Sequence, residues 1–150
     1  MSNLSDILNR PATDFHFPPP LPQGGYHCVV MALPEQIESS QKKTPGFEFA
    51  LKPISALSDV DEDELDKLGG LDGKIIKHTM WISQDASKQE TTIAMLREFL
   101  EHCGISAEGK SVMGMIDEVP NAEVIVYMKH EPLQGRDGFR AVVAKTAPAE

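Results

Sequence analysis

Residues 74–103, KIIKHTMWISQDASKQETTIAMLREFLEHC, contain two different periodic patterns in direct succession. The first part, Lys74–Ile82, is rich in β-branched residues and contains the single tryptophan, which is typical of a strand. Ser83 or Asp85 can then cap a helix over Ala86–Cys103, because both side chains accept hydrogen bonds from free backbone amides. The apolar residues of this helix recur at helical spacing on one face. The pattern predicts a strand followed by a helix that covers one end of a sheet.

Two strand-like runs precede this stretch and two follow it. Tyr26–Leu33 and Phe47–Ile54 come before it, and Ala122–His130 and Phe139–Lys145 come after it. In the earlier runs, apolar and polar residues alternate, as in strands with one face on a core. Five short strands with one main helix between the third and the fourth is the order of an OB-fold, a small Greek-key barrel. The sequence therefore predicts a mostly β protein with this five-stranded, OB-fold-like barrel.

The chain divides into three regions. Residues 1–25 form an extended arm, because Pro18, Pro19, Pro20 and Pro22 fix their own backbone and restrict the residues before them. Residues 26–146 form the barrel, and residues 147–150 form a short free tail. The arm either lies across its own barrel, which we favour, or docks on another subunit or protein.

The composition is that of an ordinary globular protein, with 41% hydrophobic and 25% charged residues. Fourteen Lys and Arg against 23 Asp and Glu give a net charge of −9, which argues against coating of duplex DNA by bulk charge. A local basic groove remains compatible with this balance, because salt screens exposed charges beyond roughly 8–10 Å. No signal peptide and no run of about 18 apolar residues is visible, so we expect a cytoplasmic protein without a membrane partner. Cys28 and Cys103 sit among apolar neighbours and are expected to be free, buried thiols.

Two motif matches are rejected on their context. Residues 104–111 fit the phosphate-binding pattern G-x-x-x-x-G-K-S, but a helix enters the loop where that motif needs a strand. Residues 59–70 begin like a calcium loop, but Glu64 stands where Gly is needed and Gly70 where Glu is needed. A solvated acidic loop or a short exposed helix is expected there instead. Neither zinc-ligand spacing nor a nucleophile motif is present, so we predict a protein that is not an enzyme and needs no metal or cofactor.

Several short motifs resemble those of small bacteriophage single-stranded DNA-binding proteins. They are residues 21–26 (LPQGGY), residues 43–47 (KTPGF), a Leu-Lys-Pro strand at residues 51–53, residues 95–100 (MLREFL) ahead of Gly104-Ile105, and a Val-x-Val-x-x-x-His pattern at residues 124–130. The resemblance covers about residues 3–145. It implies an OB-fold, single-stranded DNA as the ligand, and a role in replication or recombination beside other proteins of those processes.

A single-strand binder stacks bases on aromatic rings and tracks phosphates with cations. The candidates for stacking are Phe47, Phe49, Trp81, Tyr127 and Phe139. The candidates for phosphate contacts are Lys42, Lys43, Lys52, Lys74, Lys77, Lys129, Arg136 and Arg140. Phe47 and Phe49 share a face with Leu51, so a place in the core is the competing interpretation for both. The alternative function is a phage structural or assembly protein, in which the arm makes contacts between subunits and the barrel is only a scaffold.

Overall fold

The computed structural model describes residues 4–14, 19–135 and 138–149. Within these residues the strands are β1 (Gly24–Val30), β2 (Glu35–Glu38), β3 (Pro45–Ala56), β4 (Ile76–Trp81), β5 (Glu123–Pro132) and β6 (Phe139–Pro148). The helices are α1 (Leu4–Leu8), α2 (Glu62–Lys67), α3 (Ala86–His102) and α4 (Val112–Asp117), with a 3-10 turn at Ala12–Asp14. The predicted arginine at position 136 lies outside the described residues.

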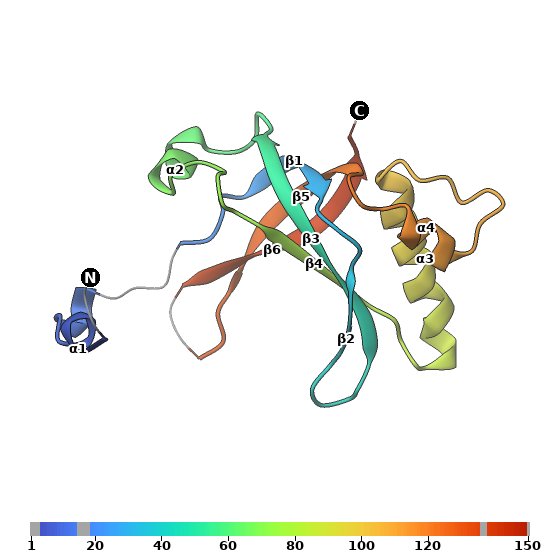
Figure 1. Ribbon diagram of the computed structural model, residues 1–150, viewed down its shortest axis with the longest axis horizontal. Coiled ribbons are helices and arrows are strands. Elements are labelled where there is room, and N and C mark those ends of the chain that lie inside the picture. The colour runs from blue at the N-terminus through green and yellow to red at the C-terminus, as the bar shows by residue number, and fades with distance from the viewer. Residues whose placement is uncertain (1–3, 15–18, 136–137, 150) are drawn as a thin grey trace.

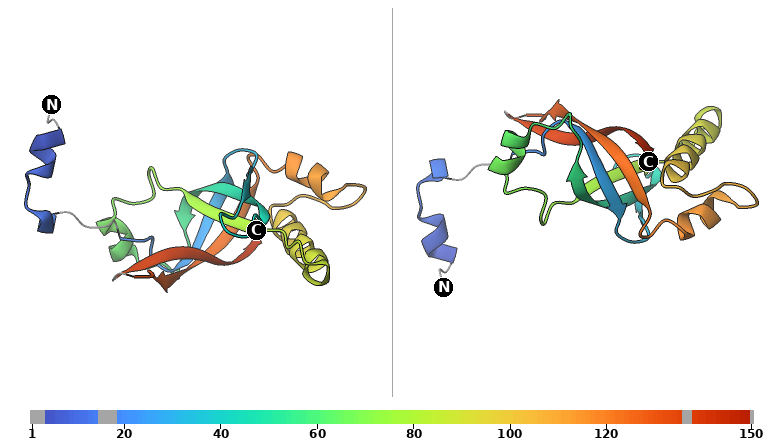
Figure 2. Two further views of the ribbon diagram at one scale, coloured as in Figure 1. Left: turned by 90° about the horizontal axis from the view of Figure 1, so that it is seen from below. Right: turned by 90° about the horizontal axis from the view of Figure 1, so that it is seen from above.

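All strands pair antiparallel in one curled sheet (Figures 1 and 2). The order is β2-β3-β1-β5-β6, and β4 pairs with β3. The 12 residues of β3 make this possible, because its first half pairs with both β2 and β4 and its second half pairs with β1. Among the described residues, no ladder joins β4 to β6. We call this opening between β4 and β6 the seam.

The expectation of a mostly β fold is confirmed, but two details were wrong. The sheet has six strands in the described part of the chain, because the predicted run Tyr26–Leu33 ends early at Val30 and a separate strand β2 follows. Pro34 stands between the two strands and has no N–H to donate to a ladder. The seam also means that the sheet is not a closed barrel. The arrangement is nevertheless consistent with an OB-like fold.

The strand that ends the fold is longer than the sequence predicted. The expected strand Phe139–Lys145 extends to Pro148, and Ala147 pairs with Ile125 of β5. Residues 147 and 148 therefore belong to the sheet and not to a free tail. The alternation of apolar and polar residues did not predict them, because Ala and Pro are uncommon in strands.

A bulge in β3, where Ile54 has no partner on β1, interrupts the ladder between these two strands. The register between β1 and β3 shifts between His27 and Cys28, next to the pair Cys28 and Pro53. Pro53 cannot donate a ladder hydrogen bond, so its place beside an irregularity is the one that proline tolerates within a sheet. The pairing of β4 with β3 ends before this proline, at Leu51 and Ile76.

The core lies inside the curl of the sheet, and α3 and α4 close one end of it (Figure 2). Strand residues with less than 2% exposure are Tyr26, Cys28, Val30, Phe49, Leu51, Val124 and Val126, and the helices add Leu96, Leu100 and Met115. The apolar face of α3 was thus predicted correctly. Both cysteines are free and buried, as expected, and burial raises the pKa of each thiol to about 12.

Of the two interpretations of the acidic segment, the short helix is the correct one. Asp61 caps α2, since its carboxylate accepts hydrogen bonds from the amides of Asp63 and Glu64 at 2.9 and 3.2 Å. No residue of α2 is buried.

Candidate nucleic-acid interface

A groove of about 530 Å³ follows the seam between β4 and β6. We call it the seam groove. Its charged and aromatic lining residues are Lys77 and Trp81 from β4, Lys129 and Glu131 from β5, and Arg140 from β6. The remaining lining residues are His78, Thr79 and residues 141–143. Side chains alternate along a strand, so Lys77, Thr79 and Trp81 share the outer face of β4.

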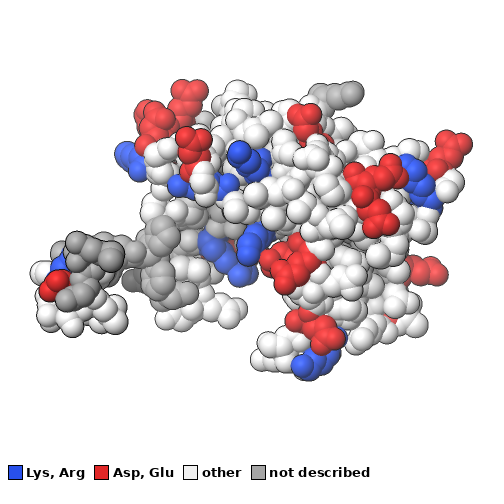
Figure 3. All heavy atoms as spheres, viewed as in Figure 1, with Lys and Arg blue, Asp and Glu red and all other residues white. Residues whose placement is uncertain are grey.

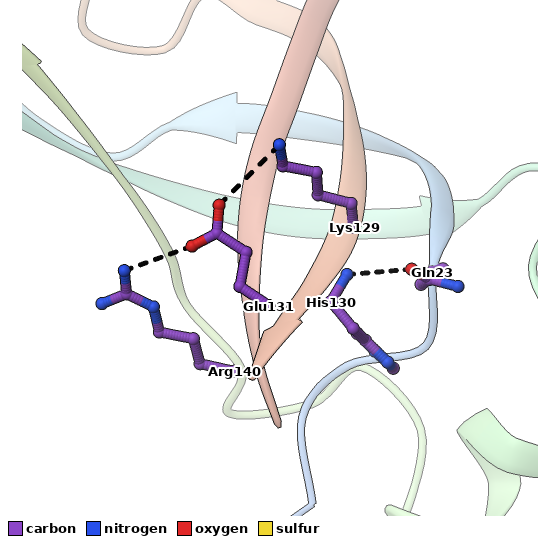
Figure 4. Close-up of polar contacts among 5 residues, drawn as sticks. All are labelled: Gln23, Lys129, His130, Glu131 and Arg140. Carbon is purple, nitrogen blue, oxygen red and sulfur yellow. Dashed lines mark hydrogen bonds and ion pairs between the residues drawn. The ribbon is translucent and has the colours of Figure 1, made fainter. Parts of the chain in front are cut away.

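Each cation of the groove has a carboxylate beside it. Glu131 lies between two of them, 3.2 Å from the Arg140 guanidinium and 3.7 Å from the Lys129 ammonium (Figure 4). On β4, the Lys77 ammonium lies 3.4 Å from the carboxylate of Glu48. Figure 3 shows Lys and Arg side chains gathered in a hollow, with acidic side chains close by. A bound anion would therefore compete with Glu48 and Glu131 for these cations.

Trp81 sits at one end of the seam groove with its indole partly in solvent. It is 42% exposed and pairs with Gly46 of β3. A Cβ atom on Gly46 would lie 2.7 Å from Cε3 of the indole, so only glycine lets the ring rest against β3 in this position. The indole is thus held in place by backbone while it remains accessible to a flat ligand.

A second hollow, of about 420 Å³, begins on the other side of Trp81. Its charged lining residues are Lys42 from the loop between β2 and β3, Lys88 from the start of α3, and Asp85, which caps that helix. Trp81 lines both hollows, so the two meet at the indole. We call the seam groove, Trp81 and this second hollow together the track.

Backbone groups also face the seam. Ile82 donates its amide to the carbonyl of Pro45 at 2.8 Å, which fixes the alternation of hydrogen bonds along β4. Because antiparallel ladders use every second residue, Lys77, Thr79 and Trp81 direct their N–H and C=O groups away from β3 and toward the seam. On β6, the amide of Leu133 donates to the carbonyl of Gly138, so every second residue of β6 directs its backbone groups away from β5 and toward the seam. A ligand in the groove therefore meets backbone donors and acceptors from both walls.

One end of the groove is fixed to the segment that precedes β1. His130 donates its backbone amide to the side-chain oxygen of Gln23 at 2.9 Å (Figure 4). The imidazole Nε2 of His130 lies 2.7 Å from the carbonyl oxygen of Leu21. The Tyr26 hydroxyl donates to the carbonyl of Pro22 at 2.7 Å. These bonds hold residues 21–23 against β5, so this part of the predicted arm lies on its own sheet.

Beneath the seam lies His78, on the inner face of β4. Its ring meets the ring of Phe99 from α3 edge to face, with centroids 5.0 Å apart. Burial lowers the pKa of His78 to about 4, so its imidazole is neutral at pH 7. Phe99 in turn meets Phe49 at 4.8 Å. This aromatic trio connects α3 with β3 and β4.

The structure brings five of the predicted site residues together along the track. They are Lys42, Lys77, Trp81, Lys129 and Arg140. Phe139 is exposed next to Arg140 and stacks on His130 with centroids 6.1 Å apart. Sequence reasoning did not point to Lys88, Glu48 or Glu131. Glu131 could have been found, because it follows Lys129 at the two-residue spacing that places both on one face of a strand.

The other predicted residues lie elsewhere. Phe49 is fully buried and Phe47 packs against the core, so the competing interpretation holds for both. The Lys145 ammonium lies 4.8 Å above the ring of the half-buried Tyr127. Of the remaining lysines, Lys43 is exposed in the loop before β3, Lys52 is exposed on β3, and Lys74 donates to the carbonyl of Leu68 at 3.2 Å.

Two residues of the phosphate-binding pattern have partners within the chain. Lys110, which completes the phosphate-binding pattern, lies 2.7 Å from the carboxylate of Glu118, and Ser111 caps α4 through the amide of Gly114. Across the described residues, no group of three or more His, Cys, Asp or Glu side chains is placed to hold a metal ion. No helix in that part of the chain is long and apolar enough to cross a membrane.

No protein-family model matches the chain, and no curated protein matches it. Among solved structures, the chain is similar to one described as yeast RPA bound to ssDNA. The alignment covers 98% of this chain and 86% of that chain, with 7% sequence identity and a TM-score of 0.33.

Proposed function

We propose that the chain binds single-stranded DNA along the track, on an OB-like sheet that serves as the scaffold. The observation that carries the proposal is an accessible indole with cations on both sides of it. Lys77, Lys129 and Arg140 line the groove on one side of Trp81, and Lys42 and Lys88 line the hollow on the other. Base stacking on such a ring contributes ~1–3 kcal/mol, and the flanking cations neutralise phosphates.

The net charge of −9 is compatible with this proposal because the track is local. Carboxylates beside the groove cations moderate the attraction, so we expect modest affinity that falls steeply with salt. The role is one of binding and not of catalysis. The setting we propose is replication or recombination in the cytoplasm, as in the phage proteins that the sequence resembles.

The second candidate function is the assembly role. It is favoured by α1, whose residues Leu4, Ile7 and Leu8 expose apolar side chains. In that case the track would bind no DNA, and titration of the protein with a labelled single strand separates the two candidates. A labelled dT strand of about 15 nucleotides is suitable, because single-strand sites cover ~4–16 nucleotides per OB-fold.

The double variant Lys77→Ala/Lys129→Ala is expected to bind this strand about tenfold more weakly than the wild type at about 50 mM salt. The plot of log K against log salt should also lose about 1.4 from its slope, since each phosphate contact on single strands contributes about 0.7. Fluorescence anisotropy at several salt concentrations measures both quantities.

The matched control is Lys67→Ala/Lys110→Ala, which removes the same charge from α2 and from the loop before α4. Binding by this control should equal that of the wild type. Equal weakening in both double variants would show bulk attraction without a track. Failure of the wild type to bind at low salt would overturn the proposal and favour the assembly role.

Replacement of Glu131 by glutamine is expected to tighten binding of the dT strand. The carboxylate now occupies Arg140 and Lys129, and exposed ion pairs of this kind contribute about 0.2–1 kcal/mol each. Freeing both cations should therefore strengthen binding by up to about thirtyfold, with a steeper dependence on salt. Anisotropy titration of the single variant measures the change.

Glu123→Gln provides the control for this variant, because Glu123 stands on the same strand, pairs with His27 and lies outside the track. Both substitutions change the net charge by one unit. If Glu131→Gln tightens binding no more than Glu123→Gln does, the groove cations do not hold the DNA.

A further inference from the structure

A smaller hollow of about 210 Å³ lies beneath the seam, between β4, β6 and α3. Its lining includes His78, Met80, Met95, Phe99, Val143 and Thr146. We call it the seam pocket. Drug-sized ligands occupy pockets of about 300–1,000 Å³, so this one suits a single ring system.

The seam pocket adjoins the seam groove. His78 on β4 and Val143 on β6 line both hollows. These two strands form no ladder with each other, so no backbone hydrogen bonds join them between the two hollows. A flat group attached to a chain in the groove can therefore reach the pocket without any strand pair being broken.

The chemistry of the pocket matches a ring with apolar faces and polar edges. Thioethers of Met80 and Met95 are polarizable and make favourable contacts with aromatic rings. The neutral imidazole of His78 and the hydroxyl of Thr146 are polar groups at its wall, and Thr146 is oriented by a 2.7 Å hydrogen bond to His102. Backbone groups of Thr79 face the seam just outside. Glu98 and Lys145 also line the pocket. The phosphate contacts come from the groove above.

We infer that the seam pocket receives one nucleobase of the strand bound in the groove, turned out of the strand and inserted through the seam between β4 and β6. The inference rests on the proposed function and adds a second mode of base contact to stacking on Trp81. Insertion requires that the base leave its stacked neighbours, which costs less in a single strand than in a duplex.

The first test fills the pocket. Met95 is exposed at the pocket's rim, so Met95→Trp is expected to fold while it blocks entry of a base. This variant should bind the dT strand about tenfold more weakly, and it should bind an abasic strand of equal length as the wild type does. Met113→Trp, an equally exposed methionine on α4, should leave both affinities unchanged.

The second test needs no substitution. With methionine methyl groups labelled for NMR, dT should shift the signals of Met80 and Met95 through its ring current, whereas the abasic strand should not. The Met113 signal should stay in place with both strands. Unchanged dT affinity in Met95→Trp, or unshifted signals of Met80 and Met95, would overturn base insertion.

The two failures are distinguishable. Base insertion alone fails if dT binds, the Lys77→Ala/Lys129→Ala variant weakens it, and the pocket shows no response. The proposed function fails together with the inference if dT does not bind the wild type at low salt.

Discussion

Replacing Phe99 by alanine is expected to lower the free energy of unfolding by about 3–5 kcal/mol. Phe99 is 2% exposed, and its ring meets Phe49 of β3 and His78 of β4. Truncation would remove the apolar contacts that join α3 to the sheet and leave a cavity in a closely packed region. Urea denaturation followed by circular dichroism measures the loss.

Phe139→Ala is the matched control, because Phe139 is 56% exposed on β6. The free energy of unfolding of Phe139→Ala should fall by less than about 1 kcal/mol, as expected for a substitution at the surface. A small effect at Phe99 would mean that α3 contributes little to the stability of the sheet. In that case α3 would not hold Met95 and Phe99 rigidly in the lining of the seam pocket.

Lowering the pH from 7 to 5 is expected to destabilise the wild type by about 2 kcal/mol through His78 alone. The pKa of His78 is lowered from 6.5 to about 4 by burial. Between these two values the unfolded chain binds a proton that the folded chain does not. The contribution of neutral His78 is therefore fully present above pH 6.5 and is lost progressively as the pH falls toward 4.

His78→Gln removes the titrating group and keeps a polar side chain of similar length. In this variant the loss of stability between pH 7 and pH 5 should be smaller than in the wild type by about 2 kcal/mol. Urea denaturation at both pH values, with unchanged slopes, checks the difference. Identical pH dependence in the two proteins would show that His78 is hydrated in the folded state.

Much of the fold could be predicted because it depends on local periodicity. Alternation revealed β1, β3 and β5, and the apolar face of α3 was visible as a stripe. Two elements lacked such signals. Glu35–Glu38 has one apolar residue, so β2 forms through pairing with β3 and not through its own pattern. The predicted five-strand closure failed because a strand's side-chain pattern does not report which edge stays unpaired.

The candidate site was partly predictable for a related reason. Exposed Lys and Trp residues on strands are visible in the sequence, and three of them, with Arg140 and the loop residue Lys42, do line the track. Whether an aromatic ring points inward depends on the register of its strand. In the register of β3, Phe49 points into the core and is completely buried. The ion pair between Glu131 and Arg140 joins β5 to β6, and a pattern within one strand cannot show a contact between two strands.

The seam has a consequence for self-association. Two unpaired strand edges are templates on which a second chain can add its own strand, and natural sheets oppose this with charged side chains along the edge. Lys77 stands on the edge of β4, and Arg140 stands on the edge of β6. The cations that we assign to phosphates would thus also act as gatekeepers that keep the molecule from polymerising through its own sheet.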